Sequence, residues 1–325
     1  MNILLTGSIA YDYLMSFPGY FRDHILPDHL DKISLSFLVE SMVRLRGGIA
    51  PNIAYTLALL GEHPRLFATV GEDFAEYREI LEKNGVDTTW ARVIPGEYTA
   101  SFFANTDRSN AQIASFYPGA MAHAADLSLR ELDGEQPDVV VISPNDPRAM
   151  TTYVEECQEL GLSYIYDPSQ QIVRLNARDI ENGLEGARAL FVNEYELALI
   201  QNITNMEEDA LRSQVEFMVV TLGERGAVIY AEGEKVGVPV IEPECIADPT
   251  GVGDAFRGGF LTGYANDLDW ETCGRMGALA AAYCLEQRGT QTHFFTPAEF
   301  VARFREHFDD FGELDFLIER DKGKG

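Results

Sequence analysis

The sequence predicts an α/β fold: a three-layer α/β/α sandwich around a mainly parallel central sheet, with a small β lid. Short apolar runs alternate with helix-like patterns along most of the 325 residues, which is typical of a parallel sheet covered by helices on both faces. Two segments interrupt the alternation with β-like patterns and predict the lid. Ligands in such folds bind beyond the carboxyl ends of the strands, so the residues after each apolar run are the candidate site.

Each element is predicted from its own pattern. The candidate strands are short buried-looking runs: NILLTG (2–7), RLFATVG (65–71), DVVVIS (138–143), SYIYD (163–167), ALFVN (189–193) and FMVVTLG (217–223). The candidate helices have apolar residues at i, i+3 and i+4 and end at or near glycine or polar residues. They are PNIAYTLALLG (51–61), RAMTTYVEECQELG (148–161) and NEYELALIQ (193–201).

The interrupting segments cover residues 13–46 and 98–117. In the second, SFFAN and QIASFY flank the turn TDRSN, a pattern typical of a hairpin. We expect the two segments to form one small β lid over the ligand edge of the sheet, although ordinary edge strands would show the same pattern. Residues 1–12, 47–97 and 118–325 are then expected to form the large α/β domain.

Composition argues against several classes of protein. The chain has 52 acidic and 25 basic residues, a formal net charge of −27, and this excess repels nucleic acids and anionic membranes. Its four cysteines form no C-x-x-C pair and its six histidines no zinc-binding pattern, so we expect reduced cysteines and no zinc site. The start of the chain does not resemble a signal peptide, and no apolar run has the length of a membrane span. A cytoplasmic protein is expected.

The stretch DPTGVGDAFRGGF (248–260) carries the strongest chemical signal. Gly251 and Gly253 permit backbone angles that other residues avoid, and a helix pattern begins at Asp254. Loop amides and the positive end of the helix would therefore converge on one spot that favours an anion. Asp254 could cap the helix, or it could be a general base that accepts the proton of an alcohol attacking a phosphoryl group.

The string DPTGVGDAF is similar to the D-T-x-G-A-G-D-x-F signature of the ribokinase-like (PfkB) carbohydrate and nucleoside kinases. Further strings follow the order of that family over nearly the whole chain: GSIAYD (7–12), GGIAPN (47–52), NEYE (193–196) and VVTLGERGA (219–227). Within the family, the chain most resembles adenosine kinases of the bacterial, actinobacterial type. The strings that carry this resemblance are LPDHLDKISLSFLVE (26–40), RGGIAPNIAY (46–55), AQIASFYPGAM (111–121), DPSQQ (167–171) and DPTGVGDAFR (248–257).

The resemblance implies ATP-dependent phosphorylation of adenosine at its 5′-hydroxyl, in the presence of Mg²⁺. Asp254 would be the general base that activates this hydroxyl. The amides of Gly251, Val252 and Gly253 would stabilise the transferring phosphoryl group. Removing one donor from such an anion hole commonly raises the barrier by roughly 3–4 kcal/mol.

Other residues would bind the nucleoside. Asp12 would accept hydrogen bonds from the vicinal ribose hydroxyls, with Asn52 and the Gly48 amide completing the grip; a solvated turn residue is the alternative for Asp12. Phe102 and Phe116 lie on the two strands of the predicted hairpin, where a purine could stack against them. Packing within the hairpin is the alternative for both rings.

Three further residues are expected near the same pocket. Gln170 and Gln171 follow SYIYD and would meet the base edge or the ribose, with a solvated turn as the alternative. Ser8 would assist this pocket unless it is simply a turn or core hydroxyl. The resemblance also implies a homodimer in which the lids pair and Ser36 reaches the site of the partner; a hydroxyl that faces its own subunit or water is the alternative.

On the nucleotide side, Asn193 and Glu196 resemble an N-x-x-E pair that organises Mg²⁺ and phosphate, through water because Mg²⁺ gives up its hydration reluctantly. An N-cap asparagine followed by an exposed glutamate is the alternative. Thr221, Gly223 and Gly226 would border the phosphates and ribose of ATP. A tight turn between two strands would also use those glycines.

The resemblance places a monovalent cation, such as K⁺, behind the anion hole. Asp248 and Thr250 would hold it together with backbone near Gly289. The chain departs from the commonest signature at Pro249 and Val252, where Thr and Ala are usual. Because Pro249 lacks a backbone donor, the geometry and the ion dependence of this site are left open.

Three other functions remain to be weighed. A kinase of the same fold could act on another nucleoside or on a sugar such as ribose or a fructose phosphate; a phosphorylated sugar would need basic lid residues, for which Arg44, Arg46 and Arg108 are the candidates. A silent nucleoside-binding protein is disfavoured by the intact Asp254. A dinucleotide-binding dehydrogenase is disfavoured because no G-x-G-x-x-G follows the first strand.

Overall fold

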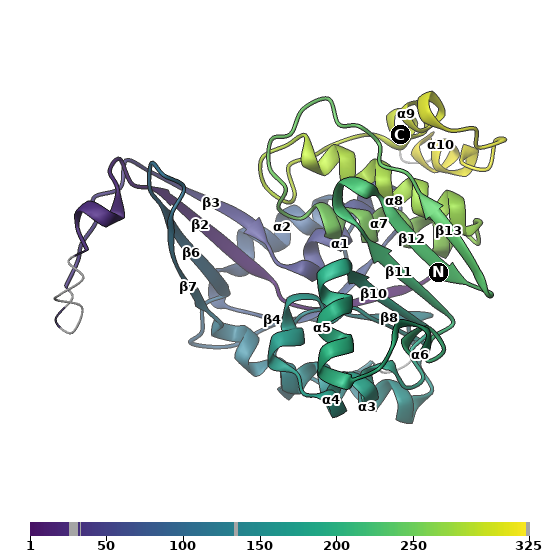
Figure 1. Cartoon of the computed structure of the whole chain (residues 1–325), viewed down its shortest axis with the longest axis horizontal. Coiled ribbons are helices and arrows are strands. Elements are labelled where there is room, and N and C mark those ends of the chain that lie inside the picture. Colours follow the sequence, from purple (N-terminus) through teal and green to yellow (C-terminus); the bar gives the residue numbers. More distant parts are fainter. Residues whose placement is uncertain (26–31, 33, 133–135, 323–325) are drawn as a thin grey trace.

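The computed structural model describes residues 1–25, 32, 34–132 and 136–322. They form an α/β body from which a smaller sheet projects to one side (Figure 1). The strands of the body are β1 (Ile3–Thr6), β4 (Arg65–Val70), β5 (Ala91–Val93), β8 (Val139–Ile142), β9 (Tyr164–Tyr166), β10 (Ala189–Asn193), β11 (Phe217–Thr221), β12 (Ala227–Ala231) and β13 (Glu234–Val238). Their order is β13-β12-β11-β10-β9-β8-β1-β4-β5. Pairing is parallel from β11 to β5, and antiparallel between β11, β12 and β13.

Helices cover both faces of this sheet. They are α1 (Ile49–Leu59), α2 (Ala75–Lys83), α3 (Pro147–Leu160), α4 (Ala177–Leu184), α5 (Glu194–Thr204), α6 (Glu208–Arg212), α7 (Val252–Ala265), α8 (Trp270–Leu285), α9 (Pro297–His307) and α10 (Asp315–Lys322). On β8, Val139 and Val141 pack into the core with α1, α7 and α8, whereas Val140 and Ile142 pack into a second core with α3, α4 and α5. This alternation follows from the two-residue period of a strand, and it confirms the predicted three-layer fold.

The six predicted strands and three predicted helices are all present, with ends shifted by a few residues at most. Three strands were not predicted: β5, β12 and β13. The last two form an antiparallel hairpin whose turn contains Glu232 and Gly233, both with positive φ (55° and 80°). The alternation in AVIYA and EKVGV around that turn was a usable signal. No helix in the described part of the chain is long and apolar enough to cross a membrane.

The projecting sheet, called the lid sheet below, contains β2 (Ala10–Ser16), β3 (Ser41–Gly47), β6 (Ala100–Thr106) and β7 (Gln112–Tyr117), in the order β3-β2-β6-β7. Strands β6 and β7 form an antiparallel hairpin around the expected turn. Strand β2 begins three residues before the expected lid boundary at residue 13, so Asp12 is a strand residue of the lid sheet and not a turn residue. Part of LPDHLDKISLSFLVE, residues 26–31 and 33, lies outside the described residues.

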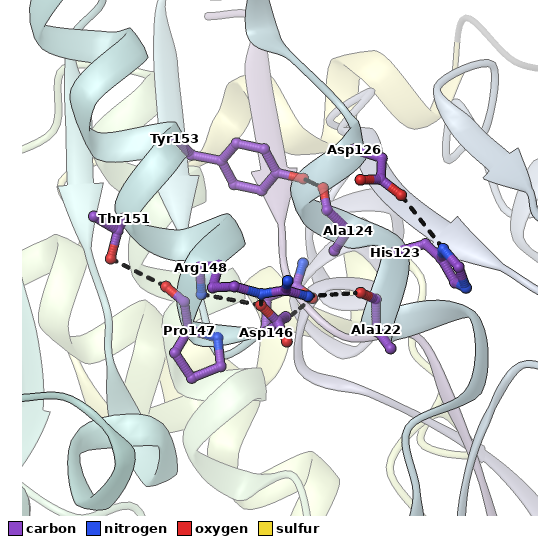
Figure 2. Close-up of polar contacts among 10 residues, drawn as sticks. Ala122, His123, Ala124, Asp126, Asp146, Pro147, Arg148, Thr151 and Tyr153 are labelled. Atoms are coloured by element: carbon purple, nitrogen blue, oxygen red, sulfur yellow. Dashed lines mark hydrogen bonds and ion pairs between the residues drawn. The ribbon is translucent and has the colours of Figure 1, made fainter.

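The segment that leads from β7 back to the body is held against α3 by hydrogen bonds. After β7 the chain enters a 3₁₀ helix, η4 (Gly119–Asp126). The hydroxyl of Tyr153 on α3 donates to the Ala124 carbonyl at 2.6 Å, and Nη2 of Arg148 donates to the Ala122 carbonyl at 3.2 Å (Figure 2). The lid sheet is thus tied at this end to α3, away from the glycine loop of α7.

Candidate active site

The glycine-rich loop ends in an uncapped helix start, as the sequence predicted for an anion site. Gly251 is the N-cap of α7 with φ 78°, and no side chain caps this helix. A Cβ at Gly251 would lie 2.7 Å from Cγ2 of Thr290, so both the backbone angle and the packing require glycine. The first-turn amides of α7 are therefore available to a bound anion such as a phosphate of ATP.

Asp254 is not the helix cap, because Gly251 occupies that position and Asp254 lies three residues further on. The Asp254 side chain is only 9% exposed. Its Oδ2 accepts a hydrogen bond of 2.8 Å from Nδ2 of Asn52 on α1. Burial raises the pKa of the Asp254 carboxyl to about 7, although Arg257 and Asn52 favour the ionised form. A carboxyl with this pKa can accept a proton near neutral pH.

Asn52 belongs to a buried chain of hydrogen bonds. Its Oδ1 accepts from Nε2 of Gln291 at 2.8 Å, and the same Nε2 donates to the hydroxyl of Tyr77 at 2.5 Å. Tyr77 in turn donates to the carbonyl of Gly47, at the end of β3, at 3.0 Å. The amide of Asn52 is thus engaged with the protein on both of its polar atoms, and it holds Asp254 where a grip on ribose was expected. Gln291 and Tyr77 were missed by sequence reasoning.

A buried ion pair contacts the first turn of α7, next to the glycine-rich loop. Asp167 follows β9 and is 0% exposed, and Arg257 on α7 is 8% exposed. Nε of Arg257 lies 2.6 Å from Oδ2 of Asp167, and Nη2 donates to Oδ1 at 2.7 Å. Nη1 of the same guanidinium donates to the Gly253 carbonyl at 3.1 Å. Neither residue was predicted as functional, although both lie within the strings DPSQQ and DPTGVGDAFR.

Three of the expected nucleoside-binding residues lie in one row across the lid sheet. Asp12 on β2 is directly opposite Phe102 on β6, and Phe102 is directly opposite Phe116 on β7. Directly opposed residues project from the same face of a sheet, so one carboxylate and two rings share a face. Phe116 is 50% exposed, so packing within the hairpin does not account for its position.

Asp12 lies where the lid sheet meets the body. A Cβ on Gly47 would be 2.7 Å from Oδ2 of Asp12, so Gly47 leaves room for this carboxylate. Burial and the nearby charge of Asp248 raise the pKa of Asp12 to about 6. Gly48, the N-cap of α1, has φ 98°, and a Cβ there would lie 2.4 Å from the Ser8 carbonyl oxygen. The pair Gly47–Gly48 therefore allows close approach of the backbone at this junction.

The remaining expected pocket residues have mixed environments. Oγ of Ser8 accepts a long hydrogen bond, 3.5 Å, from the Ile49 amide at the start of α1, which fits the turn-hydroxyl alternative. Gln170 is exposed and Gln171 buried, both within the 3₁₀ helix η6 (Ser169–Arg174). Ser36 is exposed and lies outside the lid strands.

Asn193 and Glu196 form a capping box at the start of α5. The Asn193 amide donates to Oε2 of Glu196 at 2.7 Å, and the Glu196 amide donates to Oδ1 of Asn193 at 2.8 Å. The N-cap alternative for Asn193 is therefore correct, but Glu196 is buried, 9% exposed, and not exposed as that alternative required. Ser169 also contacts Glu196, with Oγ 3.1 Å from Oε1. Both carboxylate oxygens of Glu196 and Oδ1 of Asn193 already accept hydrogen bonds. The pair therefore fits contact with a hydrated Mg²⁺ through water better than direct coordination of the ion.

The segment after β11 is shaped by strand packing. Thr221 is the last residue of β11, and Gly223 and Gly226 have φ of 60° and 85°. A Cβ at Gly226 would lie 2.0 Å from the Val238 carbonyl oxygen. The turn between β11 and β12 thus requires Gly226 whether or not a nucleotide binds beside it.

Asp248 joins the glycine loop to the segment that follows α8. Its Oδ1 accepts from the Thr250 amide at 2.9 Å and its Oδ2 from the Gly289 amide at 3.1 Å. Burial alone would raise the pKa of Asp248, but these hydrogen bonds outweigh burial and lower it. An ionised carboxylate at this position fits a cation behind the loop. Within the described residues no group of three or more His, Cys, Asp or Glu side chains could hold a metal ion.

Comparisons with known proteins agree with this geometry. The model of the pfkB family carbohydrate kinases matches residues 13–297. The nucleoside kinase of Methanothermobacter thermautotrophicus is 30% identical over 309 residues, covering 93% of this chain and 95% of that protein. The structure of Burkholderia thailandensis nucleoside kinase in complex with inosine has 37% identity and a TM-score of 0.81, covering 94% of this chain and 98% of that one. For Methanocaldococcus jannaschii nucleoside kinase the identity is 28% and the TM-score 0.84, covering 94% and 99%.

These relatives are nucleoside kinases, so the expected resemblance to adenosine kinases in particular holds only at the level of the family. The family match spans most of the chain, including the lid strands and the glycine loop. The fold, the loop and the relatives all indicate a phosphotransferase. The chain is therefore a kinase that belongs to the pfkB carbohydrate kinase family.

Proposed function

We propose that the protein is an ATP-dependent nucleoside kinase that phosphorylates the 5′-hydroxyl, with adenosine as its expected substrate. The observation that carries this proposal is the arrangement at the start of α7. There a buried carboxylate, Asp254, is held by Asn52 directly beside helix amides that no side chain caps. This pairing suits an alcohol nucleophile and a phosphoryl group that meet at one point.

In the proposed reaction, Asp254 accepts the proton of the 5′-hydroxyl as its oxygen bonds to the γ-phosphorus of ATP. The amides of Gly251, Val252 and Gly253 stabilise the negative charge on the transferring group. ADP leaves with the electrons of the broken phosphorus–oxygen bond. Asn193 and Glu196 would hold Mg²⁺ through water, and the ion would supply positive charge to the phosphates. The anionic form of Asp254 is the reactive one.

The row on the lid sheet supports a nucleoside in preference to a bare sugar. Asp12 offers a carboxylate to two neighbouring ribose hydroxyls, and Phe102 and Phe116 follow it across the sheet on the same face. Half of Phe116 is exposed, and a purine ring stacked there would cover apolar surface. The inosine complex of the Burkholderia relative supports a purine nucleoside and carries no support for adenosine over inosine.

The test is a panel of acceptors with ATP: adenosine, inosine, guanosine, cytidine, ribose and fructose 6-phosphate, each scored by ADP release and kcat/KM. The proposal expects adenosine to give the highest kcat/KM and 5′-deoxyadenosine to bind without turnover. A higher kcat/KM for inosine would overturn the adenosine assignment and keep the nucleoside kinase. A higher kcat/KM for ribose or fructose 6-phosphate would overturn both.

We also propose a homodimer formed through the lid sheets. The side chains of Leu14 and Val43, directly opposite each other on that sheet, are 37% and 49% exposed. Burying apolar area of this kind against a second copy would be favourable. Sedimentation equilibrium should give twice the monomer mass, and a monomer at assay concentrations would contradict the dimer and the expected reach of Ser36 into a partner's site.

A further inference from the structure

The buried residues Asp254, Asp167 and Arg257 are called the floor of the site below. Within the floor, the Asp167–Arg257 ion pair is unusual. Both side chains are less than a tenth exposed, and both lie among acidic groups. Taking such a pair out of water is costly, and an apolar pair of similar volume often stabilises a fold as well or better. The fold alone therefore gives little reason for two buried charges here. Their position relative to the glycine loop suggests another role.

Arg257 reaches the loop through one peptide group. Its Nη1 donates to the Gly253 carbonyl, which shares a rigid plane with the amide of Asp254. In a trans peptide the C=O and N–H point in opposite directions, so holding the carbonyl fixes the direction of that amide. The amide belongs to the first turn of α7, whose N–H groups point toward the anion site.

Asp167 fixes Arg257 in turn. Two guanidinium nitrogens, Nε and Nη2, face the two carboxylate oxygens of Asp167. In this two-point contact only Nη2 to Oδ1 is a hydrogen bond, because Nε of Arg257 and Oδ2 of Asp167 have no hydrogen-bond partner among the described residues. Together with the hydrogen bond from Nη1 to the Gly253 carbonyl, it sets the plane of the guanidinium. A lysine could supply the charge but not this fixed direction. The contacts thus run from the end of β9, through Arg257, to the peptide between Gly253 and the candidate base.

Arg257 also places a positive charge close enough to Asp254 to favour its ionised form. The ionisable groups around Asp254 are Arg257 on α7, Asp167 after β9, Glu196 on α5 and Cys284 on α8. Of these four groups only Arg257 is a cation, and its charge favours the ionised form of Asp254, as does the hydrogen bond from Asn52. Burial would lower the pKa of Arg257, but the charges of Asp167, Asp254 and Glu196 raise it above its ordinary value, so it stays a cation.

We propose that Arg257, oriented by Asp167, is a positioning residue for phosphoryl transfer that fixes the Gly253–Asp254 peptide at the anion site and places a cation in the floor beside the candidate base. The proposal rests on the proposed function of Asp254 as general base. It assigns the pair to turnover and not to folding or to nucleoside binding. Replacing the charges should therefore affect kcat and its pH dependence more than stability or KM.

The main test compares wild type with the double variant Asp167→Asn/Arg257→Met, in which neither member of the pair keeps its charge without the other. Using whichever nucleoside the wild type phosphorylates, we expect kcat to fall at least about tenfold, less than for loss of a direct anion-hole donor. The KM values for nucleoside and ATP should change by less than about threefold, because binding groups are untouched. The acid limb of the kcat–pH profile should move up by about one to three pH units.

A second variant separates charge from direction. Arg257→Lys keeps a cation but loses the two-point contact with Asp167 and the grip on Gly253. Its pH profile should stay close to that of the wild type while kcat still falls several-fold. Thermal unfolding of both variants, followed by circular dichroism, establishes that the protein is folded under assay conditions.

The outcomes are distinct. A folded double variant with the kcat and pH profile of the wild type would overturn the positioning role and leave the proposed function intact. A rise in KM with unchanged kcat would assign the pair to substrate affinity, and it would also overturn the positioning role. A wild-type protein that phosphorylates no nucleoside would instead refute the proposed function, before any variant is measured.

Discussion

In the floor of the site, Asp254, Asp167 and Arg257 are each no more than 9% exposed and contact one another or Asn52. In the lid sheet, Phe116 and Val43 are about half exposed, at 50% and 49%. The floor holds its polar groups in fixed directions before any ligand binds, which is how charge stabilisation is prepared. The lid sheet offers apolar surface that only a ligand or a second copy can bury. Chemistry and recognition are thus proposed for regions that differ in burial.

This contrast predicts two kinds of mutational effect. Changes in the floor should lower kcat, because its groups act on the reacting atoms. Changes on the ligand face of the lid sheet should raise the KM for the nucleoside, because its groups act in the ground state and the transition state alike. A lid substitution that lowers kcat selectively, or a floor substitution that alters only KM, would break the division.

The largest effect is expected for Asp254→Asn. The substitution keeps the shape of the side chain and its contact with Asn52 but removes the proton acceptor. We expect kcat to fall by about a hundred- to ten-thousand-fold, measured as ADP release at saturating nucleoside and ATP. Nucleoside affinity by calorimetry should change little. A variant that retains a tenth or more of the wild-type kcat would contradict the assignment of Asp254 as base.

The pH dependence tests the same carboxyl without mutation. Because Asp254 must be ionised and burial raises its pKa to about 7, kcat should fall about tenfold per pH unit below that pH and level off above it. The profile must be taken at saturating nucleoside, since the pKa of Asp12, raised to about 6, would affect kcat/KM. A kcat independent of pH from 5 to 8 would argue against this base.

Stability should show the opposite trend with pH. The folded pKa of Asp254 lies above the ordinary value of 3.8, so the folded state retains this proton over a range in which the unfolded chain has lost it. Stability from this group is therefore lost as pH rises from about 4 to 7. Asp254→Asn should melt higher than the wild type at pH 8, and the difference should shrink toward pH 5. Equal melting temperatures at pH 8 would show that ionisation of the buried Asp254 does not lower the stability of the folded state.

The lid sheet gives a smaller effect that tests recognition. Phe116→Ala should raise the KM for a purine nucleoside by up to about tenfold, the range expected for one aromatic contact, with kcat within about twofold of the wild type. Initial rates over a range of nucleoside concentrations separate the two constants. Because Phe116 is half exposed, its loss should change the melting temperature little.

Phe103→Ala is the matched control. Phe103 neighbours Phe102 on β6, so its side chain projects from the other face of the lid sheet, where it stacks on Tyr13 at 4.8 Å. The KM for the nucleoside should stay near the wild-type value. An equal rise in KM for both variants would mean that the lid sheet has merely been destabilised and that its two faces do not differ in function.

The sequence predicted those parts of the molecule that depend on local pattern. Buried parallel strands such as β8 and β10 are continuous apolar runs. Phe102 and Phe116 lie on the two strands of the predicted hairpin, and their binding of a nucleoside stays a prediction. The three-residue β5 and the edge hairpin β12–β13 were missed, because a very short strand and an edge strand carry weaker patterns.

Contacts between distant residues were beyond sequence reasoning. Asp167 and Arg257 are 90 residues apart, and Asn52 and Gln291 are 239 apart. No spacing rule brings such pairs together, since each member lies in a different element and only the packed fold joins them. For the same reason the contact of Asn52 with Asp254 was not predicted, and the expected role of Asn52 in binding ribose stays a prediction.

The smallest effect is expected where the two regions meet. Tyr77 is fully buried and links the Gly47 carbonyl, at the end of lid strand β3, to Gln291 and so to the hydrogen-bond chain that holds Asp254. Tyr77→Phe keeps the ring but removes this link, at a stability cost of about 1–3 kcal/mol. If the junction helps to hold Asp254 in place, kcat should also fall by about two- to fivefold, since 1 kcal/mol is about a fivefold change.

Tyr153→Phe provides the comparison, because its hydroxyl donates to the Ala124 carbonyl at the other attachment of the lid sheet (Figure 2). The same atom is removed from a similarly buried tyrosine, so the loss of stability should be similar, measured by urea unfolding. No hydrogen bond described for Tyr153 leads to Asp254, and its kcat should equal that of the wild type. Equal kcat values for both variants would mean that the junction at Gly47 contributes to folding only, and that the lid sheet and the floor act independently.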